Sequence, residues 1–332
     1  MSKVAVIGAG SWGTALALQL ARNNIDVALW GHLPEDVQTM QAKKQNSAFL
    51  PGFVFPENLR PEISLQQAVK NADEILIVVP SHAFSAVARQ LAEIIDDDVP
   101  VSWATKGLDP ADNALLSEVC QSILGTQRSY AVISGPTFAL EVAQHLPTAI
   151  VIASSQHAHG ERLASYLNDD RFRPYLSDDL IGVQVGGAAK NIMAIAAGVC
   201  DGLGFGANTR AALITRGLAE ITRFGIALGA RAETFMGLAG LGDLVLTCTD
   251  DKSRNRRCGL ALAKGLSVEE AKVSIGQEIE GIGTAREILL KASSIDIEMP
   301  ITEQAFKVLY EGLDPAEAVK ILLAREIRDE AD

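Results

Sequence analysis

Short apolar runs alternate with segments of helical periodicity through the first half of the chain. The runs have the length and the β-branched content of buried strands, and they read KVAVIG, IDVALW, EILIVVP, VSWATKG, YAVISGP and TAIVIAS. The segments between them have the apolar spacing of helices. This alternation predicts a mostly parallel sheet whose strands are joined by crossover helices.

The pattern changes after about Asp179. Long stretches rich in Ala, Leu and Ile with helical spacing follow, for example NTRAALITRGLAEITRFGIALG from Asn208 to Gly229. We therefore expect an α/β chain with two domains. A Rossmann-type domain with a mostly parallel sheet should occupy residues 1–180, and an all-helical substrate and catalytic domain residues 181–332.

Composition narrows the class of protein. The chain has 332 residues, of which 48% are hydrophobic and 21% charged, so it can bury a substantial core. Its formal net charge of −12 argues against nucleic acid or an anionic lipid surface as a partner, because both attract proteins through basic patches. An anionic ligand must therefore be held by a local cluster of cations.

The chain has the features of a cytoplasmic protein. Its 4 cysteines show no CxxC spacing, and the N-terminus lacks a charged leader followed by an apolar core and a cleavage site. Apolar runs such as ILIVV from Ile75 to Val79 are too short to span a bilayer. We expect a reducing compartment and no stable membrane insertion.

A glycine-rich segment follows the first strand directly. It reads GAGSWG and places Gly8, Gly10 and Gly13 in the G-x-G-x-x-G spacing, before the amphipathic stretch TALALQLARN. The first glycine permits a tight turn, the second lets the backbone approach a pyrophosphate, and the third lets helix and strand pack closely. The phosphates would lie at the helix N-terminus. This context predicts a dinucleotide site.

The end of the second strand bears on the cofactor. An acidic residue there would bind the ribose hydroxyls of NAD or FAD, but the sequence reads LWGHLP, with Gly31 and His32. No carboxylate would repel a 2′-phosphate, so NADP is admissible alongside NAD. The missing acid also argues against a flavoprotein.

Two segments of the first domain could carry chemistry. Lys106 follows a strand in SWATKGL, at the carboxyl edge where open α/β sheets place ligands, although a lone lysine in a loop is more often at the surface. In SGPTFALEVA, the turn at Gly135 and Pro136 is followed by Thr137 at an expected helix start. This turn offers backbone N–H donors, as would a plain helix cap.

One lysine of the helical half lies among small apolar residues. In VGGAAKNIMAIAAG, the neighbours of Lys190 at helical spacing are Gly186, Gly187, Met193 and Ala194. An unpaired charge in such surroundings is costly, so the ammonium group either reaches water or has a function. The small neighbours would let a ligand or another backbone approach.

An aspartate could pair with this lysine. Asp243 lies in GLGDLVLTCT, with Thr247 one helical turn later. It could form an ion pair with a desolvated lysine or merely cap a helix.

The segment SRNRR suggests a phosphate site. Ser253 could cap a helix whose first turn carries Arg254 and Asn255, and a helix N-terminus with an arginine binds phosphate well. We interpret Arg256 and Arg257 as a solvated basic face.

The histidines do not indicate a metal site. His157 and His159 lie in SSQHAHG, which we interpret as a surface loop, with no nearby carboxylate pair or cysteine spacing. We expect no metal.

Together these motifs resemble an ordered series known from one family. GAGSWGTALA, ATKGL, SGPTFALEVA, GGAAKNIMAIAAG, GLAGLGDLVLTCT, SRNR and GQEIEGIGTA, from Val4 to about Ala285, are similar to bacterial-type NAD(P)-dependent glycerol-3-phosphate dehydrogenase. The resemblance implies a homodimeric cytoplasmic oxidoreductase that reversibly reduces dihydroxyacetone phosphate to sn-glycerol 3-phosphate, feeding glycerophospholipid synthesis.

The resemblance also implies residue roles. Lys190 would be the acid/base group, Lys106 and Asp243 would orient and polarise the carbonyl, and Arg254 and Asn255 would bind the phosphate and its surroundings. The implied cofactor contacts, beyond the glycines, are Ser11, Trp12, His32, Lys106, Ala139, Arg254 and Glu280. The implied further substrate contacts are Gly135, Thr137 and Ser253.

The sequence departs from the family pattern at two positions. Gly31 stands where many members have an arginine, and Glu278 where a hydrophobic residue is usual. The first departure bears on NADP preference and the second on the role of Glu280.

Two other functions fit parts of the sequence. A β-hydroxyacid or ketopantoate-type dehydrogenase would share the glycines and a helical-domain lysine but would bind a carboxylate, whereas SRNR and SGPTFALEVA favour phosphate. A non-catalytic nicotinamide sensor would not need Lys106, Lys190, Asp243 and Arg254 together.

Overall fold

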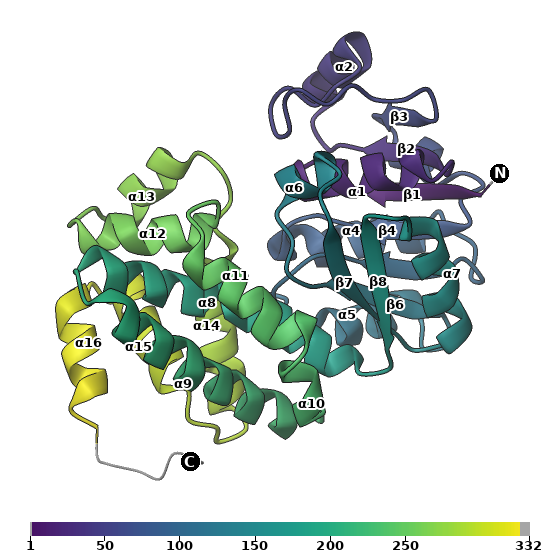
Figure 1. The fold of residues 1–332 in the computed structure, drawn as a ribbon. Helices are drawn as coiled ribbons and strands as arrows, with labels where there is room; N and C mark the ends of the chain where they lie inside the picture. Colours follow the sequence, from purple (N-terminus) through teal and green to yellow (C-terminus); the bar gives the residue numbers. More distant parts are fainter. Residues whose placement is uncertain (1, 326–332) are drawn as a thin grey trace.

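The computed structural model describes residues 2–325, in which a sheet domain and a helical domain lie side by side (Figure 1). The outer limits of the two expected domains, residues 1 and 332, lie outside the described residues. The sheet has eight strands in the order β3-β2-β1-β4-β5-β6-β7-β8. The strands are β1 (Lys3–Ile7), β2 (Asp26–Trp30), β3 (Leu59–Glu62), β4 (Glu74–Ile77), β5 (Val101–Trp103), β6 (Tyr130–Ser134), β7 (Thr148–Ser154) and β8 (Phe172–Ser177).

Every strand that the apolar runs predict is present, and two more occur. β3 reads LRPE and β8 reads FRPYLS, so each contains a proline and exposed positions. They are the two edge strands, where a missing ladder donor is tolerated. All neighbouring pairs are parallel except β6 with β7. This confirms the expected α/β class with a mostly parallel sheet.

Helices cover both faces of the sheet. They are α1 (Ser11–Arg22), α2 (Pro34–Lys43), α3 (Leu65–Val69), α4 (Ser81–Ala92), α5 (Leu116–Leu124), α6 (Ala139–Ala143) and α7 (His157–Leu167). One apolar core joins one face of the sheet to α1, α6 and α7, and a second joins the other face to α3, α4 and α5. Because the strands are buried on both faces, they appear in the sequence as continuous apolar runs.

The helical domain is built around one long helix, α8 (Leu180–Gly202) (Figure 1). The other elements are α9 (Gly206–Ala227), α10 (Ala232–Phe235), the π-helical turn η1 (Leu238–Gly242), α11 (Asp243–Thr249), α12 (Arg254–Ala263), α13 (Val268–Ile275), α14 (Glu280–Ser293), α15 (Pro300–Tyr310) and α16 (Pro315–Leu323). A separate apolar core joins them. The last strand ends at Ser177 and α8 begins at Leu180, so the proposed division at residue 180 follows a change of architecture.

Glycines bring α8 and α12 into backbone contact. A Cβ on Gly198 would lie 2.1 Å from the Arg256 carbonyl oxygen, and one on Gly259 would lie 2.0 Å from the Ile195 carbonyl oxygen. Neither position can carry a side chain without the helices moving apart. This contact fixes the N-terminus of α12 relative to Lys190.

α8 corrects one expectation about apolar segments. This helix of 23 residues is long and apolar enough to cross a bilayer. The short uninterrupted apolar runs of the chain do not indicate this. However, 83% of its apolar 18-residue window is buried within the protein, as in the core helix of a soluble protein.

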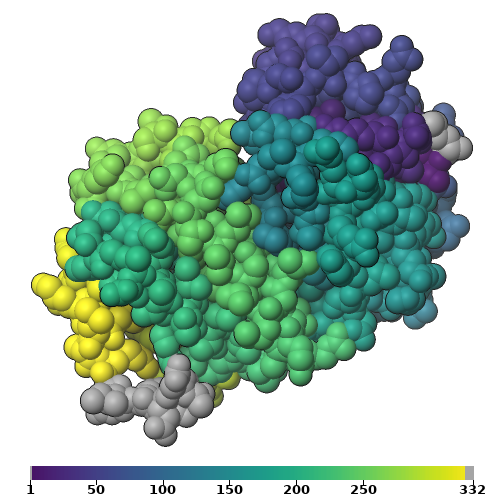
Figure 2. Space-filling model, in the orientation of Figure 1, coloured from purple at the N-terminus to yellow at the C-terminus, as the bar shows by residue number. Residues whose placement is uncertain are grey.

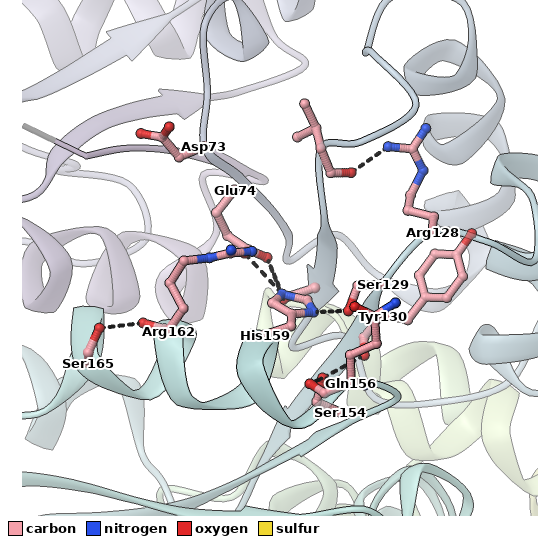
Figure 3. Close-up of polar contacts among 12 residues, drawn as sticks. Asp73, Glu74, Arg128, Ser129, Tyr130, Ser154, Gln156, His159, Arg162 and Ser165 are labelled. Atoms are coloured by element: carbon pink, nitrogen blue, oxygen red, sulfur yellow. Dashed lines mark hydrogen bonds and ion pairs between the residues drawn. The ribbon is translucent and has the colours of Figure 1, made fainter.

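The interpretation of SSQHAHG as a surface loop is wrong for His159. The segment begins α7, and His159 is buried with an exposed fraction of 2%. Figure 3 shows its ring between Glu74 and Ser129; Nε2 lies 3.0 Å from Glu74 Oε2 and Nδ1 lies 2.8 Å from Ser129 Oγ. His157 is exposed, as expected. Helical spacing turned His159 inward, where Glu74 at the start of β4 supplies its partner.

Candidate active site

The glycine-rich turn has a distinct geometry at each glycine. Gly8 has φ +128°, and a Cβ there would lie 2.5 Å from the Val78 carbonyl oxygen. A Cβ on Gly13 would lie 1.9 Å from the Gly8 carbonyl oxygen, whereas a Cβ on Gly10 would meet no described atom within 4 Å. Gly8 and Gly13 therefore serve the turn and the packing, and Gly10 leaves open space at the N-terminus of α1. That open space fits a pyrophosphate.

Residues near this turn could hold the rest of a dinucleotide. Trp12 Nε1 is a buried donor with no partner among the described residues. The Ser11 hydroxyl donates to the Phe49 carbonyl oxygen at 2.7 Å, so it is already engaged. Ala139 begins α6, whose contacts with α1 bring it to this end of the sheet.

The end of β2 is open to solvent at His32. His32 is exposed, while Gly31 is buried and a Cβ there would lie 2.8 Å from Val37 Cγ2. The packing of α2 therefore leaves little room for a side chain at position 31.

Lys190 and Lys106 converge on one carboxylate. Lys190 Nζ donates to Asp243 Oδ1, and Lys106 Nζ donates to Asp243 Oδ2 at 2.8 Å. Lys190 Nζ also donates to Thr247 Oγ1 at 3.0 Å, and the Thr247 hydroxyl donates to the Asp243 carbonyl oxygen at 2.6 Å. Asp243 is fully buried and Lys190 is 5% exposed. Lys190 is therefore paired rather than extended to water.

Burial and neighbouring charges shift the pKa values of the two lysines in opposite directions. Burial lowers the pKa of Lys190 from 10.5 to about 8; the Asp243 carboxylate opposes this shift and the Lys106 ammonium group adds to it. Burial also acts to lower the pKa of Lys106, but the charge and hydrogen bond of Asp243, together with smaller effects of Lys190 and Glu280, outweigh it and raise that pKa. At neutral pH, the site thus holds one lysine that can give up its proton and one that keeps it.

Elements from both domains form this cluster. Lys106 follows β5 in the sheet domain, whereas Lys190 lies on α8 and Asp243 begins α11. The missing side chain at Gly187 admits the sheet domain, because a Cβ there would lie 2.7 Å from Ser134 Oγ and 3.7 Å from Lys106 Cγ.

A second polar cluster adjoins the first. Asn255 Nδ2 donates to Asn191 Oδ1 at 2.9 Å, and Asn191 Nδ2 donates to Glu280 Oε2 at 3.3 Å. Asn255 Oδ1 accepts from the Gly281 amide at 2.9 Å. Asn191 therefore links α8, α12 and α14 one residue after Lys190.

The helix cap expected at Ser253 is confirmed. Its hydroxyl accepts from the Arg256 amide at 3.2 Å, and α12 begins at Arg254. No hydrogen bond or ion pair joins the Arg254 side chain to another part of the described chain, so its guanidinium is available to a ligand. The interpretation of Arg256 as solvated is wrong: it is 7% exposed and binds Asp201 at 2.5 Å and Asp251 at 2.9 Å.

The loop after β6 adds backbone groups beside the lysines. Gly135 has φ +145°, and Pro136 approaches the end of η1, directly before Asp243, since a Cβ on Gly242 would lie 3.7 Å from Pro136 Cγ. Thr137 lies in this loop rather than at a helix start, because α6 begins two residues later. Ser134 Oγ is buried without a partner among the described residues.

The contacts divide the site residues into two sets. Lys106, Lys190 and Asp243 bond directly, and Asn255 and Glu280 meet through Asn191. The glycine turn, Trp12 and His32 make no direct contact with the lysines, and a dinucleotide would have to bridge them. Figure 2 shows a hollow where the green surface of the helical domain meets the teal and blue surface of the sheet domain.

Sequence reasoning does not select Asn191 or Ser134 as site residues. Asn191 follows Lys190 directly, and a polar pair inside an apolar helix is a signal that could have identified it. Ser134 is the last residue of a strand, and nothing in the sequence around it distinguishes it from an ordinary turn serine.

Among residues 2–325, one group of side chains could bind a metal ion. Ligand atoms of His145, Asp169 and Asp170 lie within 4.8 Å of one another. Asp169 already accepts from Gln19 Nε2 at 2.7 Å and from the Phe172 amide at 2.7 Å. The expectation of no metal stays a prediction.

Comparisons with known proteins cover almost the whole chain. A family model for the N-terminus of NAD-dependent glycerol-3-phosphate dehydrogenase matches residues 3–160, and the C-terminal model matches residues 179–320. Glycerol-3-phosphate dehydrogenase (NAD(P)+) of Pseudoalteromonas translucida (strain TAC 125) is 54% identical over 330 residues, which are 99% of this chain and 98% of that protein. The enzyme of the same name from Methylococcus capsulatus (strain ATCC 33009 / NCIMB 11132 / Bath) is 53% identical, with the same coverage.

Solved structures agree with this match. The crystal structure of glycerol-3-phosphate dehydrogenase (gpsA) from Coxiella burnetii superposes with a TM-score of 0.96 at 48% identity, covering 98% of this chain and 99% of that one. A ketopantoate reductase from Ralstonia eutropha JMP134 has a TM-score of 0.61 at 18% identity, covering 96% and 99%, and shares the fold alone. On the agreement of both family models with relatives that span nearly its full length, this chain belongs to the NAD-dependent glycerol-3-phosphate dehydrogenase family.

Proposed function

We propose that Lys190, Lys106 and Asp243 catalyse the reversible reduction of dihydroxyacetone phosphate to sn-glycerol 3-phosphate. The observation that carries the proposal is the pair of lysines on one fully buried carboxylate. Two ammonium groups against one carboxylate leave a net positive charge in a place with little water. Such a site stabilises an oxygen that gains negative charge as a carbonyl is reduced.

Lys190 is the proton donor in reduction and the acceptor in oxidation. A pKa of about 8 leaves both of its protonation states accessible near neutral pH, which suits a reversible proton transfer. The bound nicotinamide supplies or accepts the hydride. Lys106, whose pKa is raised, keeps its charge and polarises the carbonyl oxygen.

Asp243 and Thr247 orient Lys190. Each binds its Nζ, so the ammonium group has one direction left in which to donate a proton. The threonine hydroxyl also donates to the backbone of Asp243 and holds the first turn of α11.

The N-terminus of α12 would bind the substrate phosphate. Ser253 caps this helix, Arg254 offers an unpaired guanidinium among the described residues, and Asn255 is fixed by Asn191. These groups provide a local anion site in a protein with a net charge of −12. Gly135 and Thr137 would complete the substrate site from the sheet domain.

The cofactor would extend from the glycine turn to the lysines. Gly8, Gly10 and Gly13 would hold the pyrophosphate, and Ser11, Trp12, His32 and Ala139 would contact the rest of the nucleotide. Lys106, Arg254 and Glu280 would meet it near the substrate. The open end of β2 at His32 supports NADP as well as NAD.

The cellular setting is also part of the proposal. We infer a cytoplasmic homodimer that supplies glycerol phosphate for phospholipid synthesis. The 4 cysteines are free and buried, which fits a reducing compartment.

A spectrophotometric assay tests the proposed reaction. Oxidation of NADPH or NADH should follow addition of dihydroxyacetone phosphate, and ketopantoate should give little or no turnover. Turnover with the keto acid and none with the phosphorylated ketone would contradict the proposal.

A further inference from the structure

One face of α14 contacts the sheet domain. Thr284, Glu287 and Lys291 are spaced by three and four residues, so they share that face. Lys291 Nζ lies 3.5 Å from Glu118 Oε2, and a Cβ on Gly107 would lie 3.6 Å from Thr284 Oγ1. Glu287 lies between them and is 5% exposed. The proposed functions of the site do not use its carboxylate.

Glu287 binds the loop that carries Lys106. Its Oε2 accepts from the amide of Leu108 at 3.4 Å, a long hydrogen bond between two buried groups from different domains. On the other side of Lys106, the Thr105 hydroxyl donates to the Val79 carbonyl oxygen at 2.7 Å. The lysine thus lies between one anchor in the sheet and one in α14.

The backbone between these anchors is permissive. Gly107 has φ +135°, a conformation that residues with a side chain rarely adopt. Glycine also restricts the backbone dihedral angles less than any other residue. The direction in which Lys106 leaves the loop therefore depends on what holds residues 105 and 108. Thr105 fixes the first, and Glu287 fixes the second.

We propose that Glu287 is a positioning residue that holds Lys106 in its catalytic orientation through the Leu108 amide. This inference rests on the role proposed above for Lys106. The same hydrogen bond connects the helix that begins at Glu280 with the loop after β5, so the placement of Lys106 depends on a contact between the two domains.

The ionisation of Glu287 should make this positioning depend on pH. Burial raises the pKa of Glu287 to about 7; the Leu108 amide and Arg286 act against the rise and Asp109 adds to it. Tyr310 faces the same carboxylate from α15, and its own pKa is raised by burial and by Glu287. Below about pH 7 the carboxyl group is neutral and a weaker acceptor, so the anchor at Leu108 loosens.

The experiment compares pH profiles of kcat for reduction of dihydroxyacetone phosphate. Wild type, Glu287→Gln and Lys291→Ala are measured from about pH 5.5 to 9 with saturating substrate and NADPH, since kcat reports groups in the bound complex. Wild type should lose activity both below about pH 7 and above about pH 8, the second limb belonging to Lys190. Glu287→Gln keeps the side-chain shape and an acceptor oxygen but cannot ionise.

The proposal expects Glu287→Gln to lose the acid limb and keep the basic one. Its kcat should stay near the low acid value of wild type, on the order of tenfold below the wild-type maximum. Lys291→Ala removes another contact between the same helix and the sheet domain, and it should keep both limbs. An unchanged acid limb in Glu287→Gln, or an equal loss in Lys291→Ala, overturns the inference.

A second variant covers the case in which Glu287→Gln does not fold. A Cβ on Gly283 would lie 3.2 Å from Glu287 Oε1, so Gly283→Ala should shift the carboxylate by a few tenths of an ångström, away from an already long hydrogen bond, without removing its charge. It should lower kcat near pH 7.5 while leaving NADPH binding intact, and a wild-type kcat would overturn the inference. A wild-type enzyme inactive on dihydroxyacetone phosphate would instead overturn the proposed function, and this inference with it.

Discussion

Lys190 is a buried cation whose charge depends on its burial and on two neighbouring charged groups. Asp243 stabilises the ammonium form, while burial and Lys106 destabilise it, and the balance leaves the pKa at about 8. A lysine at its ordinary pKa of 10.5 would hold its proton too tightly to act as a base near neutral pH. The same arrangement makes the residue sensitive to loss of any partner.

Lys190→Met should abolish most turnover while preserving the fold. Methionine matches the length and apolar stem of lysine but has no proton to donate. Removal of a general acid typically costs about 10²- to 10⁴-fold, and the loss should fall on kcat, because the proton moves only in the reaction step. Steady-state kinetics and a titration of NADPH binding would measure both effects.

The pH dependence of the wild type provides the control. In the proposed mechanism, oxidation of glycerol phosphate needs neutral Lys190, so its rate should rise as pH passes about 8, and reduction should fall over the same range. Lys190→Met should show neither limb. Near-wild-type kcat in a folded variant would show that another group transfers the proton.

Arg254→Ala should separate phosphate binding from the chemistry. The guanidinium makes no hydrogen bond or ion pair with another described residue, so its loss should leave the fold unchanged and cost substrate binding about 2–3 kcal/mol. Unphosphorylated dihydroxyacetone should be affected much less by the same change. Equal losses for the two substrates in kcat/KM would assign Arg254 to the cofactor or the fold instead.

At the scale of elements, glycines decide how closely the backbones approach. Gly187 admits Ser134 and Lys106 against α8, and Gly198 and Gly259 bring α12 onto the same helix. The N-terminus of α12 is thereby held against the helix that carries Lys190. Substitution at these positions should misplace the site before it unfolds the domain.

The glycine turn permits a direct test of which residue serves the cofactor. Gly10→Ala places a methyl group in open space, so thermal stability should change little while the Kd for NADPH rises. Gly13→Ala places it 1.9 Å from a backbone oxygen, so the variant should lose about 1–3 kcal/mol of stability. Thermal melts with and without NADPH would measure both variants. Unchanged NADPH binding by Gly10→Ala would show that no phosphate lies there.

At the scale of the whole molecule, the site exists only where the two domains meet. Lys106 comes from the sheet domain and Lys190 from the helical domain, and Asp243 binds both. A cofactor held at the glycine turn must reach across this boundary. Its nucleotide end would then lie in the sheet domain, where His32 at the end of β2 is exposed.

This open end predicts activity with both cofactors. His32 is exposed, and neither Gly31 nor His32, the two residues that follow β2 directly, has a carboxylate that would repel a 2′-phosphate. We expect kcat/KM for NADPH within about a hundredfold of that for NADH, because a larger ratio needs about 2.7 kcal/mol of discrimination. A greater preference for NADH would reveal a repelling group elsewhere in the site.

The sequence determined the alternation of strands and helices, the glycine turn and the cap at Ser253. Each of these depends on residues close together in the chain, where period, φ preference and capping chemistry act locally. The edge strands β3 and β8 were not predicted, because they contain proline and exposed positions. Their strand conformation is stabilised by pairing with β2 and β7.

Only the tertiary structure decided which polar groups meet. Nothing local distinguishes Arg256 from Arg257, yet one is buried against Asp201 and the other is exposed. His159 pairs with Glu74, which is 85 residues away in the sequence, and Lys190 pairs with Asp243, which is 53 residues away. The pKa of a buried group depends on such distant partners. The sequence could therefore suggest Lys190 as the acid/base group, but it could not predict the pKa of Lys190, which depends on how the two domains pack.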